Sequence, residues 1–395
     1  MSASVNQQEF FAPILAACAP IADLDTALDA ECAVSALLGG AYAAADEERA
    51  DAVARFSGDL VSVLSGRTDR LAAALLAGLA GVAPAEVAAT AAAAIPAEHR
   101  PAWADQVGTA RCTDAWAMRD RYGDQTEYVL VFEYPDGTRG GASHACLVLT
   151  DANLGVVKDC WTTTDPERAL ADCRRSAADN DDLSLTEVAP SAARTAIEPL
   201  LDCTDELPEL PDSAELSEDR SLLLARLATL PAAAPGDTAG HGDPVAEFLA
   251  SSEADIADAP DGVVASCTQL IVAYAAAGPT ADPYRWSPTA AELFLLDWVP
   301  ESAVLDAECV DWLPTVLLAY VTFAAGRKGL PEDAVQATQD AIREAIDDFA
   351  AAMNDTGSGD GTPNAAQVAR ALIADGVDPT DQAAVRAWLS RNLTL

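Results

Sequence analysis

The sequence predicts an α+β fold that is predominantly α-helical, in which helical N-terminal and C-terminal domains flank a small antiparallel β-sheet unit. Helical apolar spacing and helix-capping residues recur before residue 122 and again after residue 243. Between them, residues 127–162 are rich in β-branched and aromatic side chains separated by turn-forming residues. The predicted segments are a helical domain (1–122), a small α+β unit with β-hairpins (123–203), an acidic, Gly/Pro-rich linker with one short helix (204–243) and a second helical domain (244–395).

Helices are expected along residues 12–121. Thr68 suits the N-cap of one of them, because the leucines that follow recur at helical spacing: Leu71, Leu75, Leu76 and Leu79. Pro84 and Pro96 each suit the first turn of a further helix. The stretch from Trp103 to Arg121 is predicted to be another helix or pair of helices.

Four strands are expected in the middle unit: 127–134, 144–150, 156–162 and 183–188. Asp165 is placed to cap a helix that begins at Pro166. A second helix is expected from Pro190 to about Asp202. The short helix of the linker is expected at residues 220–230.

The second and third strands form a hairpin whose register decides which side chains meet. Centring its five-residue loop on Asn153 places Gly155 where the chain needs a positive φ. Residues equally distant from Asn153 then lie opposite each other, with Cβ atoms about 4.5–5.5 Å apart. The predicted pairs on one face are Cys146 with Cys160, Val148 with Lys158, and His144 with Thr162.

This hairpin holds the candidate catalytic residues, which are His144, Cys146, Asp151 and Lys158. In a catalytic interpretation, Cys146 is a nucleophile or metal ligand and His144 is its base. Side chains two residues apart on one strand face are about 6–7 Å apart, too far for a direct hydrogen bond unless they converge. In the structural interpretation, which we favour, Cys146 and Cys160 are reduced and largely buried, and His144 is a hydrogen-bonded residue near the sheet rim.

Three cap-plus-proline pairs predict helix starts in the C-terminal domain: Asp243-Pro244, Ser287-Pro288 and Asp378-Pro379. A long helix is expected after Pro331, with one apolar face made of Val335, Ile342, Ile346, Phe349 and Met353. Trp286 and Trp298 lie in the densest aromatic stretch and are candidate anchors for a protein partner. We favour a core position for them, because apolar residues cover most of this helix's circumference.

The charge of the chain argues against several kinds of partner. Its 395 residues include 63 acidic and 23 basic side chains, a net charge of −40. Such a chain repels phosphate backbones and anionic lipid, so neither nucleic acid nor a membrane surface is an expected partner. We find no apolar run of about 20 residues, and residues 1–10 lack the basic region of a secretory signal. The nine cysteines are scattered, which is typical of reduced thiols in a cytoplasmic protein.

We expect no cofactor and no metal. The loop 354–362 lacks a third calcium ligand at alternating spacing, and it lacks the Lys-Ser/Thr of a phosphate-binding loop. Gly137, Gly140 and Gly141 do not form a dinucleotide fingerprint, because no helix is predicted directly after them. The cysteines and histidines do not show zinc-ligand spacing.

Three segments resemble sequences of uncharacterised actinobacterial proteins: SHACLVLTDANLGVVKD (143–159), RWSPTAAELFLLDWVP (285–300) and GVDPTDQAAVRAWL (376–389). The likeness covers the hairpin and parts of the last third, and these motifs are structural rather than catalytic. The resemblance implies a cytoplasmic protein of actinobacterial origin and no particular activity.

The expected function is that of a non-enzymatic cytoplasmic binding or regulatory protein with a protein partner. One alternative is a hydrolase or thiol enzyme centred on the 143–160 hairpin. It requires a pocket that brings His144 to hydrogen-bonding distance of Cys146 or Asp151. The other alternative is an acidic mimic of nucleic acid, which requires carboxylates arranged in a ribbon with phosphate-like spacing.

Overall fold

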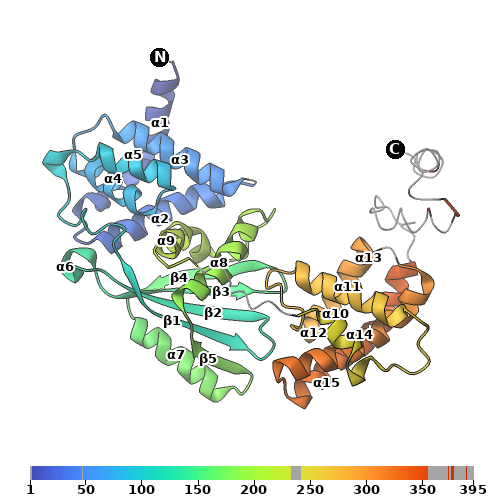
Figure 1. Cartoon of the computed structure of the whole chain (residues 1–395). Coiled ribbons are helices and arrows are strands. Elements are labelled where there is room, and N and C mark those ends of the chain that lie inside the picture. Colours follow the sequence, from blue (N-terminus) through green and yellow to red (C-terminus); the bar gives the residue numbers. More distant parts are fainter. Residues whose placement is uncertain are drawn as a thin grey trace. The chain divides into compact units, whose positions relative to one another are not determined.

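The computed structural model describes residues 2–46, 48–232, 242–303, 305–354, 372, 375–377 and 388. Within these residues the chain is predominantly helical and includes a small antiparallel sheet, which confirms the predicted fold class. The chain divides into two compact units, Met1–Thr238 and Ala239–Leu395, whose elements are labelled in Figure 1.

The first unit begins with a helical layer. Thr26 caps one helix by accepting a hydrogen bond from the Asp29 amide, and Asp69, rather than the predicted Thr68, caps another. The elements are α1 (Ser2–Ala17), η1 (Ala19–Asp23), α2 (Ala27–Ala43), α3 (Arg49–Leu64), α4 (Arg70–Val82), α5 (Ala85–Ala94) and η2 (Ala97–His99).

The sheet of the first unit has the strand order β4-β3-β2-β1-β5, and every neighbouring pair is antiparallel. The strands are β1 (Arg111–Asp120), β2 (Gln125–Glu133), β3 (His144–Asp151), β4 (Val156–Thr163) and β5 (Leu183–Glu187). Strands β2 to β5 confirm the four predicted strands.

The helix predicted from Trp103 to Arg121 is wrong, because β1 occupies its second half. Ala115 and Ala117 are buried in the core on one face, whereas Trp116 packs on the opposite face, which is strand alternation. Pairing with β2 on one side and β5 on the other stabilises the extended backbone. These tertiary contacts override the preference of this alanine-containing segment for a helix.

The predicted register of the β3–β4 hairpin is also wrong. Cys146 lies opposite Thr162, and Cys160 lies opposite Val148, so the two cysteines are diagonal rather than direct neighbours. His144, expected opposite Thr162, lies beyond the last paired residue of β4. Both cysteines are buried free thiols, as predicted.

The turn of this hairpin explains the shift. Asp151 remains in β3, and its carboxylate accepts hydrogen bonds from the amides of Asn153 and Leu154, each at 3.0 Å. Gly155 has a φ of 73°, as expected where the strand resumes. An irregularity after Leu149 then changes the register of the rest of the ladder.

Helices cover the two faces of the sheet differently (Figure 1). On one face lie α8 (Pro190–Asp205) and α9 (Ala214–Ala228), and on the other lies α7 (Pro166–Asp179), capped by Asp165 as predicted. The short α6 (Gly137–Gly140) joins β2 to β3. The expected linker helix is α9, which begins earlier than predicted and adds four buried leucines to the main core: Leu216, Leu222, Leu223 and Leu227.

The outer edge of β4 is covered by side chains from these helices. Thr204 Oγ1 accepts a hydrogen bond from the Val157 amide at 2.8 Å, and Asp219 Oδ2 accepts one from the Thr162 amide at 2.9 Å. These contacts occupy backbone donors that another strand would otherwise pair with.

The second unit is helical. Asp243 and Ser287 cap their helices as predicted, whereas Asp378-Pro379 lies outside the described residues. Beside Pro300, which has no amide hydrogen, the helical path adopts a π-type segment. The elements are α10 (Pro244–Leu249), η3 (Ser252–Ala254), α11 (Val263–Ala277), α12 (Pro288–Glu292), η4 (Leu293–Trp298), α13 (Val299–Ser302), α14 (Ala307–Lys328) and α15 (Glu332–Asn354).

Among the described residues, α14 is long and apolar enough to cross a membrane, judged by length and composition. Over half of its most apolar stretch, 56%, is buried inside the protein. Leu317 and Tyr320 of this helix have no exposed surface and belong to the core of the second unit. Core helices of other proteins meet the same two criteria.

Candidate functional site

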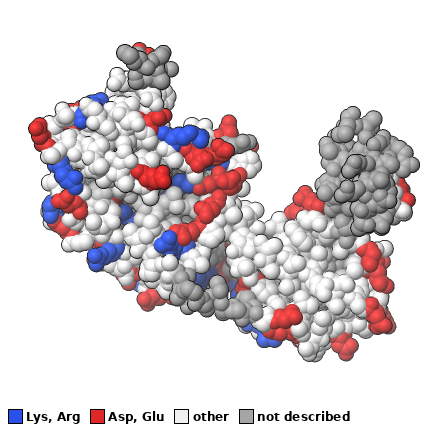
Figure 2. All heavy atoms as spheres, turned by 45° about the horizontal axis from the view of Figure 1, so that its top comes forward, with Lys and Arg blue, Asp and Glu red and all other residues white. Residues whose placement is uncertain are grey.

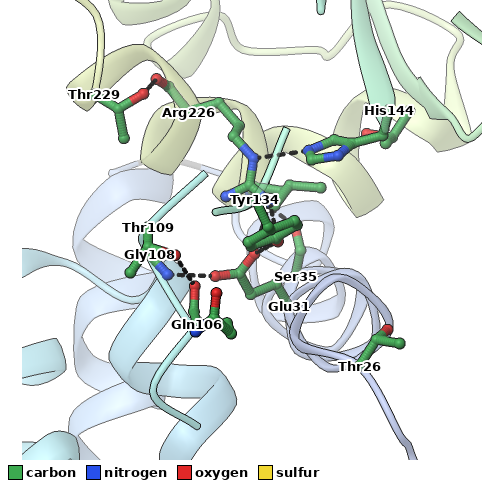
Figure 3. Close-up of polar contacts among 12 residues, drawn as sticks. Thr26, Glu31, Ser35, Gln106, Gly108, Thr109, Tyr134, His144, Arg226 and Thr229 are labelled. Atoms are coloured by element: carbon green, nitrogen blue, oxygen red, sulfur yellow. Dashed lines mark hydrogen bonds and ion pairs between the residues drawn. The ribbon is translucent and has the colours of Figure 1, made fainter. Parts of the chain in front are cut away.

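A polar network is buried between α2, the sheet and α9, and Figure 3 shows its members. Glu31 comes from α2, Tyr134 follows β2, His144 begins β3, and Arg226 comes from the last turn of α9. Glu31, His144 and Arg226 have no exposed surface, and Tyr134 is 7% exposed. We call these four residues the Arg226 network.

Arg226 is the centre of this network. Its Nη2 donates to Glu31 Oε2 at 2.6 Å and to the Tyr134 hydroxyl at 2.7 Å. Its Nε donates to His144 Nε2 at 3.0 Å. The Tyr134 hydroxyl donates to Glu31 Oε2 at 2.5 Å, and Glu31 Oε1 accepts from the Gly108 amide at 2.8 Å. Both oxygens of the buried carboxylate therefore have partners, which buried charge requires.

The hydrogen bonds fix the protonation state of His144. Because Arg226 Nε can only donate, His144 Nε2 accepts, and Nδ1 carries the proton that is directed to Ala142 O at 3.3 Å. Burial, and then the positive charge of Arg226, lower the pKa of His144 to about 3. The imidazole is neutral at ordinary pH and both of its nitrogens are engaged, so it does not act as a general base.

The other two polar groups of the network also have fixed protonation states. Burial, and then the Glu31 carboxylate, raise the pKa of Tyr134, so its hydroxyl stays protonated. Burial acts to lower the pKa of Arg226, but the Glu31 charge outweighs it and the pKa is raised. The network is thus an ion pair of Arg226 and Glu31 with neutral hydrogen-bonding neighbours.

Cys146 lies on the same sheet face as His144 but gains no base from it. Its Sγ is 4.0 Å from Thr162 Oγ1, and His144 is already engaged by Arg226. Burial raises the pKa of Cys146 to about 12 and raises that of Cys160 well above its usual range. A thiol nucleophile requires a populated thiolate, so these thiols have a packing role.

Asp151 and Lys158 lie at the other end of the hairpin. Lys158 Nζ is 3.6 Å from Asp151 Oδ2. Strand rise places Asp151 about 23 Å from His144 along β3. The structure therefore places His144 near Cys146, and Asp151 near Lys158, but it does not bring the four residues together.

The two tryptophans pack within the second unit. Trp286 is 3% exposed, and its Nε1 donates to Pro283 O at 3.1 Å. Trp298 is half-buried and stacks on Phe294, with ring centroids 5.9 Å apart. Trp286 is thus a core residue, and Trp298 packs against the same aromatic cluster.

A second buried polar cluster also joins α2 to α9. The Tyr42 hydroxyl donates to Asp205 Oδ1 at 2.9 Å, and Arg220 forms a two-pronged ion pair with the same carboxylate. Between the two clusters, Ser35 Oγ donates to Glu218 O at 2.6 Å. Polar contacts therefore extend along the whole α2–α9 interface.

A surface pocket of about 360 Å³ lies on the opposite face of the sheet, beside α7. We call it the α7 pocket. The strands contribute Met118, Glu127, Leu147, Trp161 and Thr163 to its lining, and the α7 side contributes Asp165, Arg168, Ala169, Asp172, Cys173 and Ser176. Its volume and mixed apolar and polar lining are typical of small-molecule sites.

Glu127 is the charged residue that the strands contribute to the α7 pocket. It lies on β2, paired with Met118 of β1 and Leu149 of β3. Burial raises the pKa of this carboxyl group. A carboxylate between apolar cross-strand neighbours is a candidate for ligand contact.

Among the described residues, no group of three His, Cys, Asp or Glu side chains is placed to hold a metal ion. Comparison with family models, with curated proteins and with solved structures finds no match to this chain.

The central charged residues of the Arg226 network and of the α7 pocket were not identified from the sequence. Glu31 and Arg226 each interrupt the apolar face of a helix, where a charged residue signals a buried pair. Glu127 similarly opens a run of apolar and aromatic residues in β2. Charged residues at apolar positions were the available signal, but the sequence does not show which of them pair.

Proposed function

We propose that the protein is a non-enzymatic binding protein and that the α7 pocket is its ligand site. The contrast between the two sheet faces carries the proposal. On the face covered by α8 and α9, Glu31 and His144 are buried and are both hydrogen-bonded to the buried Arg226. On the α7 face, a pocket of about 360 Å³ is lined by both apolar and polar side chains.

The side chains of the α7 pocket are suited to holding a ligand rather than attacking it. Cys173 contributes a thiol to the pocket lining. Burial, and secondly the charge of Glu127, raise the pKa of this thiol to about 11. The thiol is therefore protonated near neutral pH and is a poor nucleophile. Leu147 and Trp161, paired across β3 and β4, provide apolar contact area instead.

We also propose a reducing compartment, the cytoplasm, as the place where the protein acts. All nine cysteines are free thiols, and several are buried where oxidants have little access. The exposed charge fits a soluble binding protein: Figure 2 shows acidic side chains on the visible face of both units, with basic side chains among them in the first unit.

The methionines provide a test of the binding site. The chain contains three methionines, of which Met118 lines the α7 pocket and Met353 is buried in the core of the second unit. In protein labelled with ¹³C at the methionine methyl groups, the Met118 signal reports pocket occupancy and the Met353 signal is an internal control. We would titrate with phenethylammonium, 2-phenylethanol and phenylacetate, which share an aromatic body and differ in charge.

The proposal predicts that at least one probe shifts the Met118 signal along a saturable curve while the Met353 signal stays in place. If none of the probes moves Met118, or if both signals move together, the α7 pocket is not a binding site.

A further inference from the structure

We propose that the α7 pocket selects an organic cation, namely an ammonium or guanidinium group on an apolar body, and that Glu127 determines this selectivity. The inference rests on the proposed function, because it assigns a ligand class to the same pocket. Four features of the pocket support it.

The first feature is the environment of Glu127. Alternation along β2 places its side chain on the α7 face together with Val129 and Val131, which are both buried there. Its cross-strand neighbours, Met118 and Leu149, are also apolar. A half-buried carboxylate among apolar side chains destabilises the protein unless a cation or hydrogen-bond donor reaches it.

The second feature is that the nearby cations are engaged elsewhere. Arg168 lines the pocket, but its side chain is 79% exposed and its Nε lies 3.9 Å from Asp172. The Arg174 guanidinium lies over the Trp116 ring, 5.3 Å from its centroid. Within the part of the chain that the structure describes, the Glu127 carboxylate has no hydrogen-bond or ion-pair partner.

The third feature is the charge of the lining. Glu127, Asp165 and Asp172 contribute three negative charges to the lining, and Arg168 contributes one positive charge. Arg175, outside the lining, pairs with Asp172 at 3.0 Å, so Glu127 and Asp165 account for most of the negative charge. An anionic ligand would meet repulsion in the pocket and from the net charge of −40 on the chain. A cationic ligand would be attracted by both.

The fourth feature is the aromatic and aliphatic surface beside Glu127. Trp161 and Leu147 are paired across β4 and β3, and both line the pocket. The indole can accept a cation against its ring face, and the aliphatic side chain can pack against the apolar body of a ligand. The pocket thus combines a half-buried negative charge with apolar contact area.

Two charge-neutralising variants separate a pocket effect from a general surface effect. Glu127→Gln keeps the shape of the side chain and removes its charge. Glu133→Gln makes the same change on the same strand, at an exposed position outside the pocket. Both are titrated with phenethylammonium, 2-phenylethanol and phenylacetate at physiological salt, and the Met118 methyl signal is followed.

We expect phenethylammonium to bind about fivefold to tenfold more tightly than 2-phenylethanol, and phenylacetate to bind most weakly. Glu127→Gln should abolish the preference for the cation, and Glu133→Gln should keep it. Glu127→Gln should also raise the melting temperature without a probe, because it removes an uncompensated carboxylate.

The inference is overturned if the neutral probe binds as tightly as the cation, if Glu127→Gln keeps the preference, or if both variants lose it. In each of these cases Met118 still responds to a probe, and the proposed function stands. The absence of a Met118 response, or a response that Met353 shares, contradicts both.

Discussion

Arg226 Nη2 and Glu31 Oε2 lie 2.6 Å apart, although the residues are 195 positions apart in the chain and neither side chain reaches solvent. The pair joins α2, near the start of the chain, to α9, a helix that is predicted from the sequence to lie in a linker. It therefore ties two distant parts of the chain into one core.

Removing one partner of this pair should strongly destabilise the first unit. Arg226→Met leaves the Glu31 carboxylate buried without its cation, which costs about 3–5 kcal/mol in comparable pairs. Urea unfolding measures the loss, and Arg343→Met is the control because Arg343 pairs with Asp340 at the surface. Equal losses in the two variants would contradict the structural importance of the buried pair.

Stability should depend on pH through His144. In the folded protein its pKa is about 3, against about 6.5 for an exposed histidine. Below about pH 6.5 the unfolded chain takes up a proton that the folded chain does not, so folding weakens as the pH falls toward 3. Above about pH 6.5, the contribution of neutral His144 to the free energy of unfolding is fully present.

His144→Gln should remove this part of the pH dependence. Unfolding free energies measured by urea at pH 7.5 and pH 4.5 should differ less in His144→Gln than in the wild type. His99→Gln is the control, because His99 is exposed. An equal change in the free energy of unfolding between pH 7.5 and pH 4.5 in all three proteins would contradict a buried, neutral His144.

Much of the sheet could be predicted from local sequence, because β-branched and aromatic runs flanked by turn residues identify β2, β3 and β4 without tertiary information. β1 could not be predicted in this way. Its residues 111–120 have no strong strand preference, and they are extended because two partner strands hold them.

The site was harder to predict than the fold. The hairpin register depends on the Asp151 carboxylate, which forms a local turn, and on an irregularity after Leu149. The neighbours of His144 come from α2 and α9, far away in the sequence. Local patterns do not specify contacts at that separation.

Two adjacent glycines of α2 should respond in opposite directions to substitution by alanine. A Cβ on Gly39 would overlap Ser217 O of α9, whereas a Cβ on Gly40 would meet nothing within 4 Å. Gly39→Ala should therefore cost about 1–3 kcal/mol by forcing α2 and α9 apart. Gly40→Ala should raise the free energy of unfolding by about 0.5–1 kcal/mol, because alanine has a higher helix propensity than glycine.

Thermal unfolding of the two glycine variants side by side checks this prediction. A stabilising effect of Gly39→Ala would show that α2 and α9 are not in close backbone contact.

The buried thiols of the hairpin should resist alkylation. Cys146 has a pKa raised to about 12 by burial, and Cys160 is likewise buried and raised, so neither presents a thiolate near neutral pH. Cys203 is exposed and should be labelled first by iodoacetamide at pH 7.5. Mass spectrometry of the labelled peptides gives the order, and rapid labelling of Cys146 in the folded protein would favour a thiol enzyme.

Obstructing the α7 pocket tests the binding proposal most directly. Ala169 lines the pocket, and Ala171 on the same helix is exposed and does not. Ala169→Trp should therefore abolish the probe-dependent shift of the Met118 methyl signal, and Ala171→Trp should leave its saturation curve unchanged. An unchanged Met118 response in correctly folded Ala169→Trp would contradict the assignment of the α7 pocket as the ligand site.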